Sequence, residues 1–218
     1  MIHQTIEYVW TDEKNNFVSK SRSFTVPLYV LKDVPPWDID GSSLNLCNYC
    51  VTLKPLAMFN DPFYPCFNQI HKIVYCEKII NNISYESVDI LKNTQGLFDI
   101  KQGYVILDRS SNKPILTNTS IFVYELGDIL RYSGMDVLYN LNITSYQCEL
   151  ALNINSEYDI GYQLCISKYI LKRYGNERYL CILFDKPIQD NISNLFNKMS
   201  LETIKEESLE ESLKQMII

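Results

Sequence analysis

Alternating apolar and polar residues dominate the first 77 positions of the chain and predict β-structure there. Four stretches show this pattern: 6–10, 17–25, 51–59 and 71–77. Turn-forming residues at 12–16 join the first two into a hairpin, and residues 26–31 are expected to add another strand. Residues 35–43 are rich in Pro, Gly and Ser, which predicts a loop. The N-terminal part is therefore predicted to consist of strands and loops.

Helical and strand patterns alternate in the second part of the chain. Apolar residues recur every three or four positions in four predicted helices: 85–93, 121–132, 159–174 and 200–216. Strands are predicted at 97–107, 144–153 and 180–184. Gly175 is expected to end the third helix. We predict an α+β fold with two domains, residues 1–80 and 95–218.

The composition is that of a folded protein, because 46% of the 218 residues are hydrophobic and only 21% are charged. The net charge of −6 and the pI near 5.0 argue against nucleic acid as a partner. Half of that charge lies in residues 201–218, which hold five Glu and two Lys. No stretch reaches the roughly 20 apolar residues of a membrane-spanning helix. The N-terminus lacks a signal-peptide pattern, and the seven Cys are an odd number. We predict a cytoplasmic protein with no membrane partner.

The cysteines and histidines offer weak signals for metal or nucleophilic chemistry. Cys47 and Cys50 form a C-x-x-C pair, but a structural zinc site needs a second pair, and Cys66 and Cys76 lie ten positions apart. His3 and His71 are the only histidines, and neither lies in a recognisable catalytic setting. We predict incidental thiols, solvent-facing histidines and no metal site.

A more specific signal lies in residues 35–63, PPWDIDGSSLNLCNYCVTLKPLAMFNDPF. The segment Trp37-x-x-Asp40-Gly41-Ser42-Ser43, followed by Pro-x-Ala and Asp-Pro-Phe, resembles the N-terminal domain of eukaryotic-type glutamine synthetase. EYVWTD (7–12), SKSR (19–22) and IVYCE (73–77) resemble other strands of that domain. A fainter resemblance to the first part of the catalytic domain is carried by FDIKQGY (98–104), NLNITSYQCEL (140–150), IGYQLCISKYILKR (160–173) and FDKPI (184–188).

The resemblance implies a β-grasp N-terminal domain followed by a truncated α/β catalytic domain. In the family the N-terminal loop of one subunit completes the active site of its neighbour, and the residue matched by Asp40 helps to bind and deprotonate ammonium there. A purely structural role for Asp40 and Gly41 in a turn remains an alternative. The chain is shorter than the family's enzymes, so we expect the later nucleotide- and glutamate-binding segments to be missing.

The positions that match the family's cation ligands are largely replaced. The family reaction uses ATP and magnesium or manganese held by carboxylates and one imidazole. Two of its Glu positions are occupied by Lys101 and Gly103 and a third by Asn142, so that Glu149 remains. Glu149 has a structural alternative as an ordinary strand carboxylate. We therefore predict no catalytic centre and no cofactor, with Asp40 and Glu149 as remnants.

Two functions remain open at this point, beside the alternative of a decaying gene product whose folded domain has no function. The first is a non-catalytic glutamine synthetase-like pseudoenzyme that binds a protein, either a full-length glutamine synthetase or another copy of itself, through the loop at Trp37–Ser43. The second is a residual or remodelled ATP-dependent glutamate–ammonia ligase. The abundance of Asn, Ile, Lys and Tyr indicates an AT-rich genome such as that of a large DNA virus or a parasite.

Overall fold

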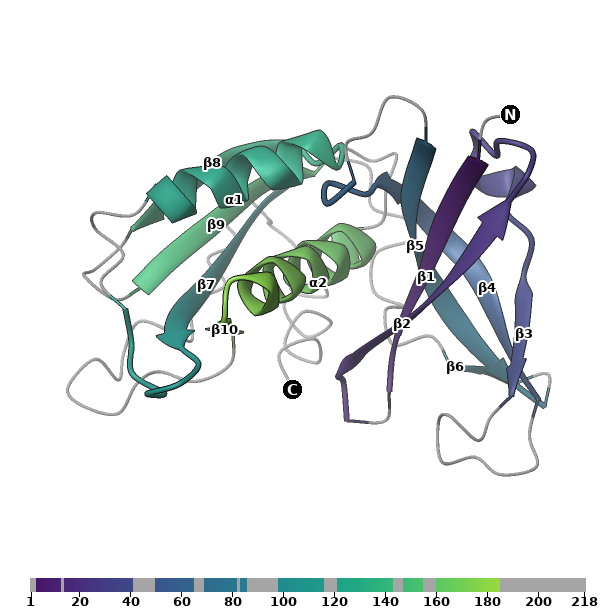
Figure 1. Ribbon diagram of the computed structural model, residues 1–218, viewed down its shortest axis with the longest axis horizontal. Coiled ribbons are helices and arrows are strands. Elements are labelled where there is room, and N and C mark those ends of the chain that lie inside the picture. Colours follow the sequence, from purple (N-terminus) through teal and green to yellow (C-terminus); the bar gives the residue numbers. More distant parts are fainter. Residues whose placement is uncertain are drawn as a thin grey trace. The chain divides into compact units, whose positions relative to one another are not determined.

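The computed structural model describes the following residues: 3–12, 14–40, 50–64, 69–81, 83–85, 98–115, 121–142, 147–154 and 160–184. The chain divides into two compact units, Met1–Asp89 (unit 1) and Ile90–Ile218 (unit 2). Figure 1 shows strands in both units and α-helices in unit 2, so the described residues form a sheet-rich α+β architecture.

Unit 1 is built on a six-stranded mixed sheet. Its elements are β1 (His3–Thr11), β2 (Phe17–Phe24), the 3-10 helix η1 (Leu31–Asp33), β3 (Trp37–Asp40), β4 (Cys50–Asn60), β5 (Gln69–Ile80) and β6 (Ile83–Tyr85). The strand order is β2-β1-β5-β4-β3, with β6 paired to β5. β1 runs antiparallel to β2 and parallel to β5.

The predicted opening hairpin is confirmed, and its turn has a clear physical cause. The Asp12 carboxylate accepts hydrogen bonds from the backbone N–H groups of Lys14 (2.8 Å) and Asn16 (2.7 Å). Asn15 adopts a positive φ of 59°, a conformation that Asn tolerates better than most residues. The alternation in β1 then places Ile6, Tyr8 and Trp10 in one buried cluster.

Two predictions for unit 1 are wrong. Residues 26–30 form no strand, because the chain leaves the sheet after β2. The Gln4 side-chain amide holds this segment by donating to the Leu28 carbonyl (2.9 Å). The predicted loop at 35–43 contains β3, whose Ile39 is buried in the core while Trp37 packs against it. Tertiary burial therefore overrides the turn-forming composition of this segment.

Unit 2 holds a four-stranded antiparallel sheet of order β10-β7-β9-β8. Its elements are β7 (Phe98–Asp108), α1 (Ile121–Tyr132), β8 (Val137–Asn142), β9 (Gln147–Ile154), α2 (Ile160–Glu177) and β10 (Leu180–Leu183). α1 runs along β8 and α2 contacts β10 (Figure 1). The helices also touch each other, with the rings of Phe122 and Tyr174 5.0 Å apart. Both helices therefore cover the same face of the sheet.

The predicted helix at 121–132 is confirmed, whereas the prediction that Gly175 ends the next helix is wrong. α2 continues to Glu177, and Gly175 packs closely under β10. A Cβ atom at position 175 would lie 3.0 Å from Ile182 Cγ1, so the glycine permits a close approach between helix and strand. Of the helix predicted at 85–93, Tyr85 belongs to β6 and residues 86–93 lie outside the described residues, as does the helix predicted at 200–216.

Candidate functional site

The face of the unit 2 sheet opposite the two helices, here called the open face because no described helix covers it, brings together three polar side chains that we call the open-face triad: Lys101, Tyr139 and Glu149. The register pairs Ala151 of β9 with Lys101 of β7 on one side and with Tyr139 of β8 on the other. Cross-strand neighbours lie on the same face of a sheet. Because alanine projects only a methyl group, the long side chains of Lys101 and Tyr139 can meet above it.

The triad is connected by hydrogen bonds. The Tyr139 hydroxyl donates to Glu149 Oε1 at 2.8 Å. Lys101 also hydrogen-bonds to the Tyr139 side chain, and because an ammonium group can only donate, the phenol oxygen accepts. Glu149 itself pairs with Gly103 on β7, which carries no side chain, and with the exposed Leu141 on β8. All three members of the triad are half-buried.

Partial burial and the neighbouring carboxylate act together on Tyr139. Burial, followed by the hydrogen bond to Glu149 and its negative charge, raises the pKa of Tyr139 above 10.0, whereas the Lys101 ammonium lowers it. The phenol therefore keeps its proton near neutral pH and remains a donor to Glu149.

The opposite face of the same sheet carries a second polar group, here called the buried pair: Tyr104 and Asn140. The Tyr104 hydroxyl donates to Asn140 Oδ1 (2.8 Å), and Asn140 Nδ2 donates to the Val123 carbonyl of α1 (2.7 Å). Burial raises the pKa of Tyr104 well above 10.0. Asn140 thus ties α1 to the sheet.

The open-face triad does not have the ligand set of a divalent cation site. A cation site of this kind needs several oxygen ligands. Glu149 is the one carboxylate of the triad and already accepts from Tyr139, and Lys101 adds positive charge beside it. Over the described residues, no group of three or more His, Cys, Asp or Glu is arranged to hold a metal ion.

Asn142 is separated from the triad in the strand register. It pairs with Cys148, one position along from the Leu141–Glu149 pair. Since successive residues of a strand alternate between faces, the backbone places position 142 in register with the helix-covered side. Its side chain lies outside the described residues.

The predicted interface loop begins at β3 of unit 1. The Trp37 ring packs edge-on against Tyr8, with centroids 5.2 Å apart, and lies beneath Lys20 (5.7 Å) and Arg22 (5.9 Å) of β2. Asp40 is exposed at the other end of β3 and pairs with Cys50. Gly41, Ser42 and Ser43 lie outside the described residues.

Other predicted features are placed as follows. His3 is exposed, and the half-buried His71 stacks on Tyr64 at 4.7 Å. Cys50 is exposed and Cys76 is buried, both as free thiols, while Cys47 and Cys66 lie outside the described residues. In the described part of the chain, neither helix combines the length and apolarity needed to span a bilayer.

Sequence reasoning missed Tyr139, because β8 was not predicted as a strand of its own. The alternation in VLYNLN (137–142) was the available signal.

Comparison with known proteins finds similarity to glutamine synthetases. The chain is 26% identical to glutamine synthetase of Fusarium solani over 96% of its length, and 26% identical to the chloroplastic glutamine synthetase of Zea mays over 97%. It is also 25% identical over 93% of its length to a protein of Acanthamoeba polyphaga mimivirus named for glutamine synthetase. The chain is a glutamine synthetase relative. No family model matches it.

The coverage of these glutamine synthetases is partial. The matches span 70%, 59% and 67% of the fungal, maize and viral proteins, respectively. The activity, substrates and partners of a whole glutamine synthetase therefore enter only as proposals for this chain.

Proposed function

We propose that this glutamine synthetase relative is a non-catalytic pseudoenzyme that acts by binding another protein. The observation that carries the proposal is the open-face triad. Positions matched to two cation-binding carboxylates hold Lys101 and Gly103, and the surviving Glu149 accepts a hydrogen bond from Tyr139, which Lys101 also contacts. A triad with one occupied carboxylate and an added ammonium group gives poor support to two bound cations and the phosphates of ATP.

The proposal includes an assignment of the two units. Unit 1 would be the family's N-terminal β-grasp domain, which the mixed sheet with parallel β1 and β5 supports. Unit 2 would be the first part of its catalytic domain. A cytoplasmic location is also part of the proposal, supported by the free thiols among the described cysteines.

The proposed partner is a full-length glutamine synthetase or a second copy of this chain. In the family the loop matched by Trp37–Ser43 is shared between neighbouring subunits. Here Trp37 is held between Tyr8 and the cations of β2, and Asp40 is exposed at the start of the loop. Such an anchored loop could still be offered to a neighbouring subunit.

Calorimetry with ATP and Mg²⁺ or Mn²⁺ at millimolar concentration tests the loss of catalysis. We expect no binding heat and no γ-glutamyl product from glutamate and ammonia. The double variant Lys101→Glu/Gly103→Glu removes the ammonium and restores two carboxylates, so it should gain Mn²⁺ binding. Turnover by the wild-type chain would overturn the proposal and favour a remodelled ligase instead.

Co-purification with a full-length glutamine synthetase tests the binding role. We expect capture by the wild-type chain and weaker capture by Asp40→Ala. Asp38→Ala is the matched control, because Asp38 is an exposed acid on the same strand that hydrogen-bonds to Thr52 (2.6 Å). Equal capture by all three proteins would reject a role for Asp40 in the shared loop.

A further inference from the structure

A tyrosine holds an unfavourable backbone conformation just after α2. Over the described residues, four residues other than glycine have a positive φ: Asn15, Asn81, Asn112 and Tyr179. Asn tolerates this left-handed region better than most side chains, whereas a bulky side chain there is an outlier. Tyr179, with a φ of 58°, therefore carries a conformational cost that the three asparagines largely avoid.

The end of the helix explains the left-handed conformation but not the tyrosine. The Tyr179 N–H donates to the Asn176 carbonyl (3.2 Å) as the chain turns after α2. The left-handed residue that follows a helix is usually glycine and sometimes asparagine, because both adopt this conformation at low cost. The Tyr179 side chain is 79% exposed, so its ring adds little to the core. The fold thus needs the turn at this position but gains little from a tyrosine.

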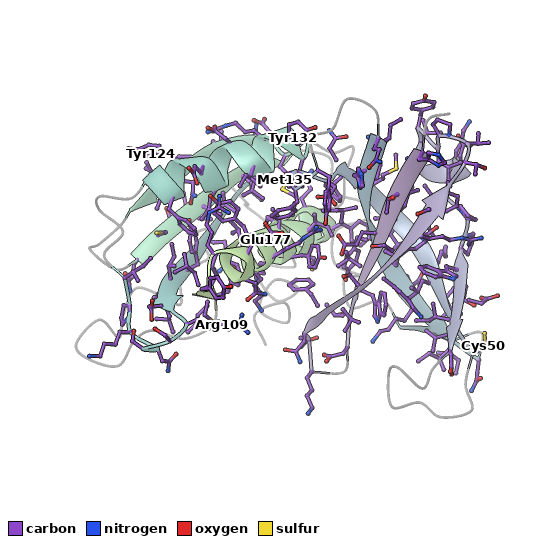
Figure 2. All side chains as sticks on the ribbon, in the orientation of Figure 1. Cys50, Arg109, Tyr124, Tyr132, Met135 and Glu177 are labelled. Atoms are coloured by element: carbon purple, nitrogen blue, oxygen red, sulfur yellow. The ribbon has the colours of Figure 1, made fainter. Side chains whose placement is uncertain are left out.

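Two cations lie in the adjoining turn without a carboxylate partner. The Arg109 N–H donates to the Tyr179 carbonyl (3.2 Å), which places Arg109, directly after β7, across from Tyr179 (Figure 2). Lys113 closes the same turn, because its carbonyl accepts from the Asp108 N–H (2.9 Å). Both cations are exposed, and neither forms an ion pair within the described residues. The acid of this turn, Asp108, accepts instead from the backbone N–H (2.8 Å) and hydroxyl (2.9 Å) of Ser111.

The neighbouring Arg178 shows the contrast with these two cations. Its guanidinium lies 3.5 Å from the centre of the Tyr174 ring and 3.6 Å from a carboxylate oxygen of Glu125. The charge of Arg178 is therefore balanced within the fold, whereas the charges of Arg109 and Lys113 are not. Tyrosine and arginine are also the residue types that most often anchor protein–protein interfaces.

We infer that Tyr179, Arg109 and Lys113, here called the Tyr179 surface, bind an acidic segment of a partner protein. The exposed ring supplies contact area, and the two unpaired cations select carboxylates by charge complementarity. Binding rather than folding then accounts for a tyrosine at a strained position. The Tyr179 surface belongs to unit 2, so the inference goes beyond the role proposed for Trp37–Ser43 and does not depend on it.

Fluorescence anisotropy of the full chain with a labelled poly-Glu peptide tests the Tyr179 surface, with a poly-Gln peptide as the neutral control. The chain has a net charge of −6, so poly-Glu should be repelled except where unpaired cations lie together. We expect saturable binding of poly-Glu that weakens with added salt, and no binding of poly-Gln. Arg109→Gln should weaken the affinity at least about fivefold. Lys14→Gln, which removes an exposed cation from the hairpin turn of unit 1, should leave it unchanged.

The variant Tyr179→Asn separates a binding role from a structural one. Because Asn tolerates the left-handed conformation, the folding equilibrium constant in urea denaturation should rise about fivefold. The affinity for poly-Glu should nevertheless fall at least about fivefold, because the contact area of the ring is lost. Tyr124→Asn is the matched control and should show neither effect, because Tyr124 is a 71%-exposed tyrosine on α1 (Figure 2).

Three results would overturn the Tyr179 surface. They are a wild-type chain that does not bind poly-Glu, an unchanged affinity in Tyr179→Asn, and tighter binding of a poly(dT) oligonucleotide than of poly-Glu. If a chain that failed to bind poly-Glu still captured a full-length glutamine synthetase, the proposed function would stand without this surface.

Discussion

The two faces of the unit 2 sheet hold similar polar groups in different surroundings. On the helix-covered face Tyr104 donates to Asn140, and both side chains are buried. On the open face Tyr139 donates to Glu149 beside Lys101, and all three are half-buried. Water can replace a lost partner on the open face but not beneath the helices, where an unpaired polar group keeps its full desolvation cost. Substitutions in the buried pair should therefore destabilise the fold, whereas substitutions in the open-face triad should change its stability much less.

The largest expected difference between the faces comes from removing the two tyrosine rings. Tyr104→Ala should lower the free energy of unfolding by about 4 kcal/mol, because a fully buried ring leaves a cavity. Tyr139→Ala should cost about 1 kcal/mol, since its ring is partly exposed already. Urea denaturation of the two variants measures both values. Equal losses of unfolding free energy in the two variants would contradict the expected difference between the faces.

Asn140→Ala should lower the free energy of unfolding by about 2 kcal/mol, because the Tyr104 hydroxyl and the Val123 carbonyl both lose their partner. The control is Asn153→Ala, whose amide donates to Asp136 at an exposed site (2.8 Å). This control should change stability by less than about 0.5 kcal/mol. If the two variants were equally stable, the buried pair would not hold α1 to the sheet.

The two faces should also differ in how the ionisation of their tyrosines, Tyr104 and Tyr139, changes the free energy of unfolding with pH. Burial holds the pKa of Tyr104 well above 10.0, whereas an unfolded tyrosine ionises near that value, so the folded chain retains this proton to higher pH. The contribution of Tyr104 is complete below pH 10 and is lost as the pH rises further. Tyr104→Phe should flatten the decline in unfolding free energy above about pH 10 more than Tyr139→Phe does. Denaturant titrations across this range measure it, and a decline unaffected by Tyr104→Phe would contradict the prediction.

The smallest expected effect on stability is that of Lys101→Met, less than about 0.5 kcal/mol, because partly exposed charge pairs contribute little. Its effect on titration should nevertheless be clear. The Lys101 ammonium lowers the pKa of Tyr139, so its removal should raise that pKa further. Absorbance of tyrosinate during alkaline titration follows this change, with Lys113→Met, in an exposed turn, as the control. Identical titrations would show that Lys101 does not act on Tyr139.

The elements with strong local patterns were predictable. The hairpin of β1 and β2 follows from alternation and from Asp12 in the turn, and α1 follows from apolar residues at helical spacing. β3 was not predictable in this way, because Ile39 and Trp37 gain their burial from residues far along the chain. The end of α2 was wrongly predicted for the same reason, because Gly175 permits the close contact with Ile182 and does not end the helix.

The alternating strands and the helical spacing of α1 follow from the sequence alone, because each depends only on residue types and their order. The contact of Lys101 with Tyr139 over Ala151 and the burial of Asn140 beneath α1, in contrast, arise from tertiary structure. Strand register brings together residues nearly 40 to 50 positions apart, and no local pattern encodes which of them will become neighbours.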